Sequence, residues 1–308
     1  MSIVSSREVE LSVNVYEGDM DFVDATYRHV LGQLAGRPDV QRLVVDRSTP
    51  SGRFSASSGE RRLDACVSRL LDEGLVDAVT DVDWGELAVR RTMERYFGDP
   101  AAPTRCSSGT PIYQYLAAID ACASPYLLHL DSDMLLHLGD GARWIDEGID
   151  HIQQNRHVAI VTPEGGPPKA TSTSDWIRGP RPTDHRQRWH ASEGVSTRIF
   201  LMDVQRFRSR AVPLVPAEPG ETLERTLTHT FHLRGLERHS LNDDHNYALH
   251  PRRHNENHRR YLPGLIALVE SGRAPYRRTG FRWDMRTEGR HFAPWWLAIQ
   301  RERLWPGR

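Results

Sequence analysis

The sequence contains few cysteines and no excess of charge of either sign. Its three cysteines, Cys66, Cys106 and Cys122, stand far apart and form no CxxC pair, which disfavours a disulfide framework and a cysteine zinc site and fits a reducing compartment. The 40 Lys and Arg residues nearly balance the 41 Asp and Glu residues, and this removes the usual electrostatic basis for binding nucleic acid. We therefore expect a cytoplasmic protein with no nucleic-acid partner.

The sequence also lacks long hydrophobic runs. A helix that spans a bilayer needs about 18–20 consecutive apolar residues, whereas the apolar runs here, such as residues 126–128, are only a few residues long. The first residues, MSIVSSREVELS, lack a basic segment followed by an apolar core, so we expect no secretory signal. The 308 residues suffice for one large domain or for two.

Segments with strand periodicity alternate with segments of helical periodicity. In residues 11–16, LSVNVY, apolar and polar side chains alternate as in a strand, and apolar residues between 19 and 34 recur at helical spacing. Further strands are predicted at 43–45, 75–79, 126–130, 157–162 and 198–202, and further helices at 61–73, 85–96, 111–122, 142–154, 221–234, 263–270 and 294–304. This alternation predicts an α/β fold with a central, mainly parallel sheet flanked by helices.

Two carboxylates follow the strand predicted at 126–130. Asp131 and Asp133 are spaced i and i+2 directly after it, and ligands of open parallel sheets bind outside the carboxyl ends of the strands. Carboxylate oxygens suit hard cations such as Mg²⁺ and Mn²⁺, and a metal there would neutralise charge on a diphosphate leaving group. A solvated turn is the alternative, because Asp and Ser are ordinary turn residues.

Around these carboxylates the sequence resembles a known family. The segment SPYLLHLDSDMLL at 124–136 is similar to the donor-site strand of glycosyltransferases of the GT-A fold, particularly family 2. In that family the DxD motif holds the metal and the nucleotide diphosphate. The resemblance implies that Asp131 and Asp133 bind Mn²⁺ or Mg²⁺ and that Asp131 also belongs to the donor site.

Two earlier segments resemble motifs of the same family and occur in the same order along the chain. LVVDRS at 43–48 resembles the second-strand motif, which implies that Asp46 contacts the base and ribose of the donor. LSVNVYEGD at 11–19 resembles the first strand and its following loop, but the usual Pro-Thr-Tyr-Asn signature is absent. The resemblance covers roughly residues 9–270.

The family also implies a catalytic base on a late helix. There, a Glu-Asp pair precedes a glycine by eleven residues, and its second carboxylate activates the acceptor hydroxyl; Glu224 stands at this distance from Gly235, although Leu223 replaces the first member of the pair. A positioned carboxylate base contributes about 10²–10⁴-fold to a rate. Alternatively, Glu224 only complements a helix N-terminus. Asp243 and Asp244 are the other candidates for the base.

Family members often carry a late histidine that completes the metal or diphosphate site. The LHP segment at 249–251 matches this pattern and implies His250, and the neighbouring Arg252 could pair with phosphate oxygens. His250, His254 and His258 also recur at i, i+4 and i+8. On a helix they would form a stripe of imidazoles, and three imidazoles can hold a catalytic zinc. A zinc-dependent hydrolase is therefore an alternative.

The resemblance implies a GT-A (Rossmann-like) fold with a C-terminal helical extension and a metal-dependent glycosyltransferase. It would move a sugar from a nucleotide-diphospho-sugar, with UDP-sugars favoured, to a hydroxyl or amine with inversion. The resemblance does not indicate which acceptor is used, and it leaves open whether the chain forms a homodimer. A sugar nucleotidyltransferase is an alternative. Such enzymes usually carry a Gly-rich loop with a basic residue directly after the first strand, whereas this chain has YEGDMDF at 16–22. A non-catalytic nucleotide- or carbohydrate-binding module is another alternative.

The chain is predicted to divide into three parts. Residues 1–163 form the donor half, 164–260 the acceptor loop and catalytic half, and 261–308 the C-terminal extension. Residues 164–196, rich in Gly and Pro at their start, are predicted to be a functional loop that closes over the acceptor. Its tryptophans, Trp176 and Trp189, either stack on a sugar or anchor the loop.

Overall fold

The computed structural model describes residues 7–48, 56–139, 143–166, 188–209, 213–241, 243, 245–275 and 284–304. Trp176, Asp244 and most of the predicted loop at 164–196 lie outside the described residues.

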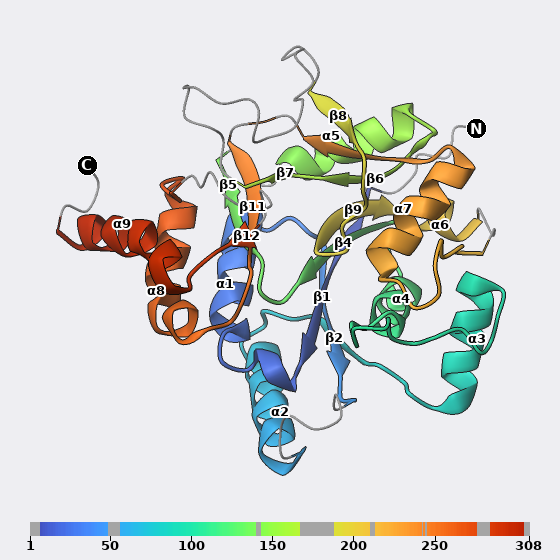
Figure 1. The fold of residues 1–308 in the computed structure, drawn as a ribbon, viewed down its shortest axis with the longest axis horizontal. Coiled ribbons are helices and arrows are strands. Elements are labelled where there is room, and N and C mark those ends of the chain that lie inside the picture. Colours follow the sequence, from blue (N-terminus) through green and yellow to red (C-terminus); the bar gives the residue numbers. More distant parts are fainter. Residues whose placement is uncertain are drawn as a thin grey trace.

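An eight-stranded sheet runs through the centre of the molecule (Figure 1). Its strands, in spatial order, are β3 (Ala78–Asp81), β2 (Val40–Asp46), β1 (Val9–Tyr16), β4 (Tyr126–Asp131), β9 (Ile199–Asp203), β6 (Val158–Thr162), β10 (Glu237–Leu241) and β8 (Trp189–Ser192). β9 pairs antiparallel with β4 and β6, and β8 pairs antiparallel with β10. The other pairings are parallel, so all strands except β9 and β8 share one direction, and the predicted mainly parallel sheet is confirmed.

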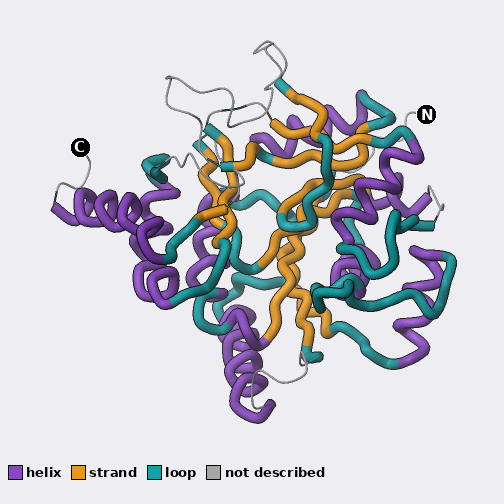
Figure 2. The backbone as a smooth tube through the Cα atoms, viewed as in Figure 1, coloured by secondary structure: helices purple, strands orange, loops and turns teal. Residues whose placement is uncertain are grey.

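Helices cover both faces of this sheet, as the tube in Figure 2 shows. One face packs against α1 (Val23–Leu34), α2 (Ala56–Asp72) and α5 (Arg143–Gln154), and the other against α3 (Glu86–Phe97), α4 (Tyr113–Ala121) and α7 (Leu223–Arg234). Because strand side chains alternate in direction, Leu128 and Leu130 of β4 join the first core while Leu127 joins the second. The flanking helices of the predicted fold are therefore present.

A smaller sheet lies beside the central one. It contains β12 (Asp284–Met285), β11 (Asn246–Pro251) and β5 (Leu135–Leu138), with β7 (Glu164–Gly165) also paired to β11. A third core joins β5 and β11 to α8 (Glu256–Glu270) and α9 (Ala293–Leu304). The short helices are η1 (Glu17–Asp19), α6 (Val204–Ser209) and η3 (Gly289–Phe292).

The structure differs from the sequence predictions at three points. Strands β7 and β8 lie within residues 164–196, which the sequence predicts as a loop. The helix predicted to begin at Pro263 begins at Glu256, where the Asn255 side chain caps it by accepting a hydrogen bond from the His258 backbone N–H. Strands β5, β10 and β11 have no predicted counterpart, because they are short and their apolar residues alternate weakly.

The predicted C-terminal helical extension is confirmed by α8 and α9. Trp295 of α9 is buried in the third core, whereas Trp296 is 43% exposed. Among the described residues, no helix is both long and apolar enough to cross a bilayer. The three-part division of the chain stays a prediction.

Candidate active site

The two carboxylates lie in a tight turn between β4 and β5, at the carboxyl edge of the central sheet. Asp131 ends β4, and the chain passes through Ser132 to Asp133 before β5 begins. The Thr26 hydroxyl of α1 donates to the Ser132 carbonyl at 2.6 Å, and the Ser132 hydroxyl donates to Asp19 Oδ2 at 2.7 Å. This turn is therefore held from two sides, and it is not the solvated turn of the alternative interpretation, since Asp133 is only 6% exposed.

The register of the small sheet brings His250 to this turn. β11 pairs antiparallel with β5 so that Leu249 lies opposite Leu135, and the next residue along β11 is therefore beside the turn that precedes β5. His250 Nε2 lies 3.2 Å from Asp133 Oδ2, and His254 Nε2 lies 2.8 Å from the same oxygen. The structure thus joins the predicted Asp133 and His250 and adds a second imidazole.

The predicted helical stripe of three histidines is wrong. His250 belongs to β11, His254 lies in the connection that follows, and His258 lies in the first turn of α8. His258 is fully buried, with its ring near those of Phe22 and His254. Burial lowers the pKa of His258 to about 4, so this imidazole is neutral at pH 7. Of the three, only His250 and His254 are close enough to bond with Asp133.

The charges of this cluster are set by burial and by the imidazoles. Burial alone would raise the pKa of Asp133, but the His250 and His254 imidazoles lower it below its usual range, so the carboxylate is ionised. Burial, with the neighbouring Asp133 and Asp131 charges, raises the pKa of Asp19 well above its usual range. The protein therefore concentrates acidic groups at one edge of the sheet, where a cation would offset their repulsion.

Asp131 is oriented by a second set of side chains that leads to Glu224. The Tyr115 hydroxyl donates to Asp131 Oδ1 at 2.8 Å, and Thr197 Oγ1 donates to Glu224 Oε1 at 2.8 Å. Burial and Asp131, with a further contribution from Glu224, raise the pKa of Tyr115 well above its usual range. Tyr115 therefore stays protonated, with Asp131 as its hydrogen-bond acceptor and Glu224 of α7 within electrostatic range.

Asp46 ends β2 at the same edge of the sheet and is buried. Its Oδ1 accepts hydrogen bonds from the Ser48 backbone and hydroxyl and from Trp84 Nε1, at 2.8, 2.6 and 2.9 Å. Its Oδ2 lies 3.7 Å from Arg105 Nη2, and the Arg105 guanidinium lies over the Trp84 ring at 5.5 Å. One strand, β1, separates β2 from β4, and Asp46 pairs with its Tyr16 whereas Asp131 pairs with its Asn14. The two aspartates are therefore offset along the strands as well as across them, and stand about 12 Å apart.

The residues present fit a divalent cation. One ligand atom each from Asp131, Asp133 and His250 lies within 4.8 Å of the others, and carboxylates with one imidazole suit Mn²⁺ or Mg²⁺. Among the described residues, Asp133 Oδ1 and both amide atoms of Asn14 are buried without a hydrogen-bond partner. Asn14 lies beside Asp131 in the β1–β4 register. Such orphaned polar atoms are costly unless a ligand or water reaches them.

Other predicted site residues are placed elsewhere or differently. Arg252 has an exposed side chain, and its backbone N–H donates to the Met285 carbonyl. The Asp243 carboxylate has a structural role, because its Oδ2 accepts hydrogen bonds from Arg188 at 2.6 Å and from Asn246 at 2.8 Å. Trp189 is half-buried in β8, where it stacks on His151. The anchoring interpretation of Trp189 therefore agrees with its contact.

Sequence reasoning did not identify Asp19 or Tyr115 as site residues and considered His254 only in a helical stripe. Asp19 follows β1 at the same edge as Asp131, so its position after a predicted strand is a usable signal. Tyr115 lies on the helical stripe of α4 and reads as a core residue. His254 meets Asp133 only through the turn after β11, which no local pattern reveals.

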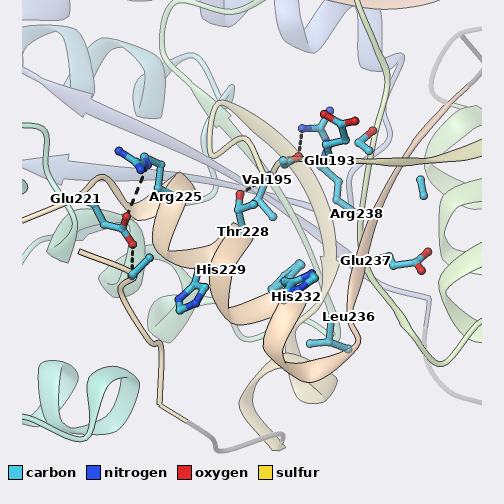
Figure 3. Close-up of a pocket in the computed structure, with 15 residues that line it drawn as sticks. Glu193, Val195, Glu221, Arg225, Thr228, His229, His232, Leu236, Glu237 and Arg238 are labelled. Atoms are coloured by element: carbon cyan, nitrogen blue, oxygen red, sulfur yellow. Dashed lines mark hydrogen bonds and ion pairs between the residues drawn. The ribbon is translucent and has the colours of Figure 1, made fainter. Parts of the chain in front are cut away.

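A cavity of about 610 Å³ lies next to this site, along another side of α7 (Figure 3). Its lining includes Val195, Glu221, Arg225, Thr228 and Arg238, but neither Glu224 nor the metal-ligand candidates. At the Asp131–Asp133 turn, by contrast, two carboxylates and one imidazole converge within 4.8 Å, and Asp133 is buried. We therefore assign the candidate active site to the Asp131–Asp133 turn and not to this cavity.

No protein-family model and no curated protein matches the sequence. Among solved structures, the chain is similar to one titled crystal structure of a mycobacterial protein, at 14% identity and TM-score 0.41, over 86% of this chain and 73% of that one. It is similar to GalNAc-T7 with UDP, GalNAc and Mn²⁺, at 13% identity and TM-score 0.46, over 79% of this chain but only 43% of that one. It is also similar to glucosyl-3-phosphoglycerate synthase from Mycobacterium tuberculosis in complex with Mn²⁺, UDP and phosphoglyceric acid, at 14% identity and TM-score 0.39, over 86% and 76%.

The titles of two of these structures name Mn²⁺ and UDP. They do not test membership of family 2. Because each TM-score is below 0.5, the likenesses are remote, and function is inferred from the site residues.

Proposed function

We propose that the chain is a metal-dependent glycosyltransferase that moves a sugar from a nucleotide-diphospho-sugar to an acceptor hydroxyl or amine. The observation that carries this proposal is the convergence of Asp131, Asp133 and His250 within 4.8 Å at the carboxyl edge of the sheet. A divalent cation held by these residues supplies positive charge to a diphosphate leaving group. Mn²⁺ and Mg²⁺ both fit this donor set.

Neighbouring residues position the ligands. The Tyr115 hydroxyl fixes the direction of Asp131, and His254 bonds to the same oxygen of Asp133 as His250 does. Residues that orient metal ligands change metal affinity by about 10–100-fold when they are removed. The exposed Arg252 is one residue beyond β11, and we assign it to the diphosphate as a mobile cationic partner.

The nucleoside is assigned to the Asp46 end of the edge. Oδ1 of Asp46 is filled by its bonds to Ser48 and Trp84, so Oδ2 is the oxygen left for a ribose hydroxyl or a base N–H. Trp84 and Arg105 supply flat surfaces next to it. The separation of about 12 Å between Asp46 and Asp131 leaves room for a nucleoside and its diphosphate between them.

Glu224 is assigned as the base that takes the proton of the acceptor. Its Oε1 accepts from Thr197, which holds the carboxylate in place and leaves Oε2 for an acceptor hydroxyl. Removal of that proton as the oxygen attacks the anomeric carbon is a step for which a positioned carboxylate provides about 10²–10⁴-fold. A single displacement with this base would invert the anomeric centre. We further propose that the donor is a UDP-hexose and that the chain is related to glycosyltransferase family 2.

Nucleotide titration tests the donor site first. UDP, GDP and dTDP are titrated calorimetrically into the protein with and without Mn²⁺, and we expect one nucleotide to bind only with the metal. Release of free nucleoside diphosphate from the matching sugar nucleotide then tests transfer or slow hydrolysis. Binding of none of the three nucleotides contradicts the proposal, and binding without release indicates a non-catalytic module.

Glu224→Gln separates catalysis from binding. Glutamine keeps an oxygen that accepts from Thr197, so nucleotide affinity should hold while diphosphate release falls by about 10²–10⁴-fold. Glu86→Gln is the matched control, because Glu86 also lies in the first turn of a helix but is exposed on α3. Equal losses in the two variants would assign Glu224 to helix stability and not to proton transfer.

A further inference from the structure

A second cluster of histidines lies at the other side of the central sheet, where β10 and β6 run side by side. Glu237 and His239 are two residues apart on β10, so they point to the same face. His157 immediately precedes β6, and its carbonyl accepts from the Glu237 backbone N–H at 2.9 Å. His151, in the last turn of α5, completes the group. None of these residues belongs to the candidate active site.

The ligand atoms of three of these residues converge. One atom each from His157, Glu237 and His239 lies within 4.8 Å of the others. His157 Nε2 is 3.7 Å and His239 Nε2 is 2.7 Å from Glu237 Oε2. In Figure 3 the Glu237 carboxylate points away from α7. The exposure of His157 and Glu237 leaves an open path for an ion from solvent.

Hydrogen bonds fix which nitrogen of each ring carries a proton. Asn155 Nδ2 donates to the His151 carbonyl at 2.8 Å and to His151 Nδ1 at 3.2 Å, so Nδ1 is an acceptor and the proton of the neutral ring is on Nε2. A ring nitrogen that accepts a hydrogen bond carries no proton, so the His151 ring is neutral. Its Nε2–H therefore donates to His239 Nδ1 at 2.9 Å.

His239 then has only one nitrogen for a metal. With Nδ1 occupied as an acceptor, its proton lies on Nε2 and is shared with Glu237 Oε2. That proton is the one that a cation would replace, because metal ions bind deprotonated imidazole nitrogen and carboxylate oxygen. For tetrahedral zinc with ligands about 2.1 Å away, neighbouring ligand atoms are about 3.4 Å apart. The His157–Glu237 spacing is near this value, and the His239–Glu237 spacing needs to open by about 0.7 Å.

We propose that His157, Glu237 and His239 form a second metal site, selective for Zn²⁺, with His151 as the residue that orients His239. Two imidazoles and one carboxylate are a zinc donor set that leaves the fourth position to water. This site has two imidazole ligands and one carboxylate, whereas the cluster at Asp131 and Asp133 has more carboxylates and therefore prefers harder cations. Binding of Zn²⁺ releases the proton from His239 Nε2.

Equilibrium dialysis against Zn²⁺, with the bound metal counted per chain, tests this site. The wild-type chain should hold one equivalent that the Asp133→Asn variant retains and that His157→Gln and His239→Gln each lose. His232→Gln, at an exposed position on α7, is the matched control and should bind as the wild type does. His151→Phe should bind about 10–100-fold more weakly, as expected for an orienting residue.

The exposure of the ligands makes the outcome decisive. His157 and Glu237 are exposed, so His157→Gln should keep the melting temperature of the metal-free protein, and any loss of zinc then reports on ligation. Full zinc content in both His157→Gln and His239→Gln overturns the proposal. Loss of all zinc in Asp133→Asn also overturns it, because the bound ion would then belong to the other cluster.

Discussion

Asp133→Asn removes one negative charge from the carboxylate–histidine cluster while it keeps the shape of the side chain. In the metal-free protein, the loss weakens two hydrogen bonds from His250 and His254. Hydrogen bonds to charged groups contribute about 1.5–3 kcal/mol, and relief of repulsion from Asp19 and Asp131 opposes this loss. A bond to the neutral amide keeps about 0.5–1.5 kcal/mol, so each of the two bonds loses about 1–1.5 kcal/mol. We therefore expect the free energy of unfolding of the metal-free variant to fall by at most about 3 kcal/mol.

The same substitution should remove the response to metal. A cation at about a hundred times its Kd stabilises the folded state by about 2.7 kcal/mol. For 308 residues, an unfolding entropy of about 2.1 cal/mol/K per residue gives about 0.65 kcal/mol/K. Saturating Mn²⁺ should therefore raise the Tm of the wild-type chain by about 4 °C and that of Asp133→Asn by almost nothing.

The assay is thermal unfolding with and without Mn²⁺, monitored by circular dichroism. Asp120→Asn is the matched control, because Asp120 is a partly buried carboxylate that accepts from Arg95 and Tyr96 and lies outside the cluster. The control should lose stability yet keep the wild-type metal shift. If Asp133→Asn gains the same shift as the wild type, Asp133 is not a metal ligand and our reasoning is refuted.

Three further predictions concern other parts of the chain. Tyr115→Phe removes the bond to Asp131 and should weaken Mn²⁺ binding by about 10–100-fold in calorimetry; unchanged affinity would contradict its orienting role. Leu128→Ala in the fully buried centre of β4 should cost about 2–5 kcal/mol in urea unfolding, and a smaller cost would show that the core can collapse around it. Burial lowers the pKa of His29 below 6.5, so the unfolded chain binds the proton more readily and stability is lost as pH falls below 6.5. His29→Gln should therefore lose less stability than the wild type between about pH 7.5 and 5.5, and identical losses would contradict this sign.

The sequence predicts those elements whose apolar periodicity is long and regular. The alternation in β1 and the helical stripe of α4 are local patterns, and the α/β architecture follows from repeating them. Asp131 and Asp133 are predictable for the same reason, since they directly follow a buried strand. His250 is predicted as a site residue only by the family resemblance.

The remaining parts depend on contacts between distant segments. β5 and β11 are short strands that are stabilised by pairing with each other, and neither is regular enough to be predicted alone. His254 and Tyr115 gain their roles from the turn after β11 and from the packing of α4 under β4. The Pro263 error has a different cause. The proline costs about 3 kcal/mol within a helix, which the Asn255 cap offsets only in part, and burial of Leu265, Leu268 and Val269 in the third core supplies the rest.

The register between β5 and β11 also affects how the site assembles. Asp133 and His254 are 121 positions apart. Tyr247 and Leu249 of β11 pack with α8 in the third core, and only Ala248 of β11 joins the first core. A local opening that frees β11 from β5 would carry His250 and His254 away while β4 stays paired with β1 and β9. Amide exchange in β11 should consequently slow when metal is added, whereas exchange in β1 should not. The affinity of the proposed metal site would therefore report how firmly residues 246–304 are docked, and not the carboxylates alone.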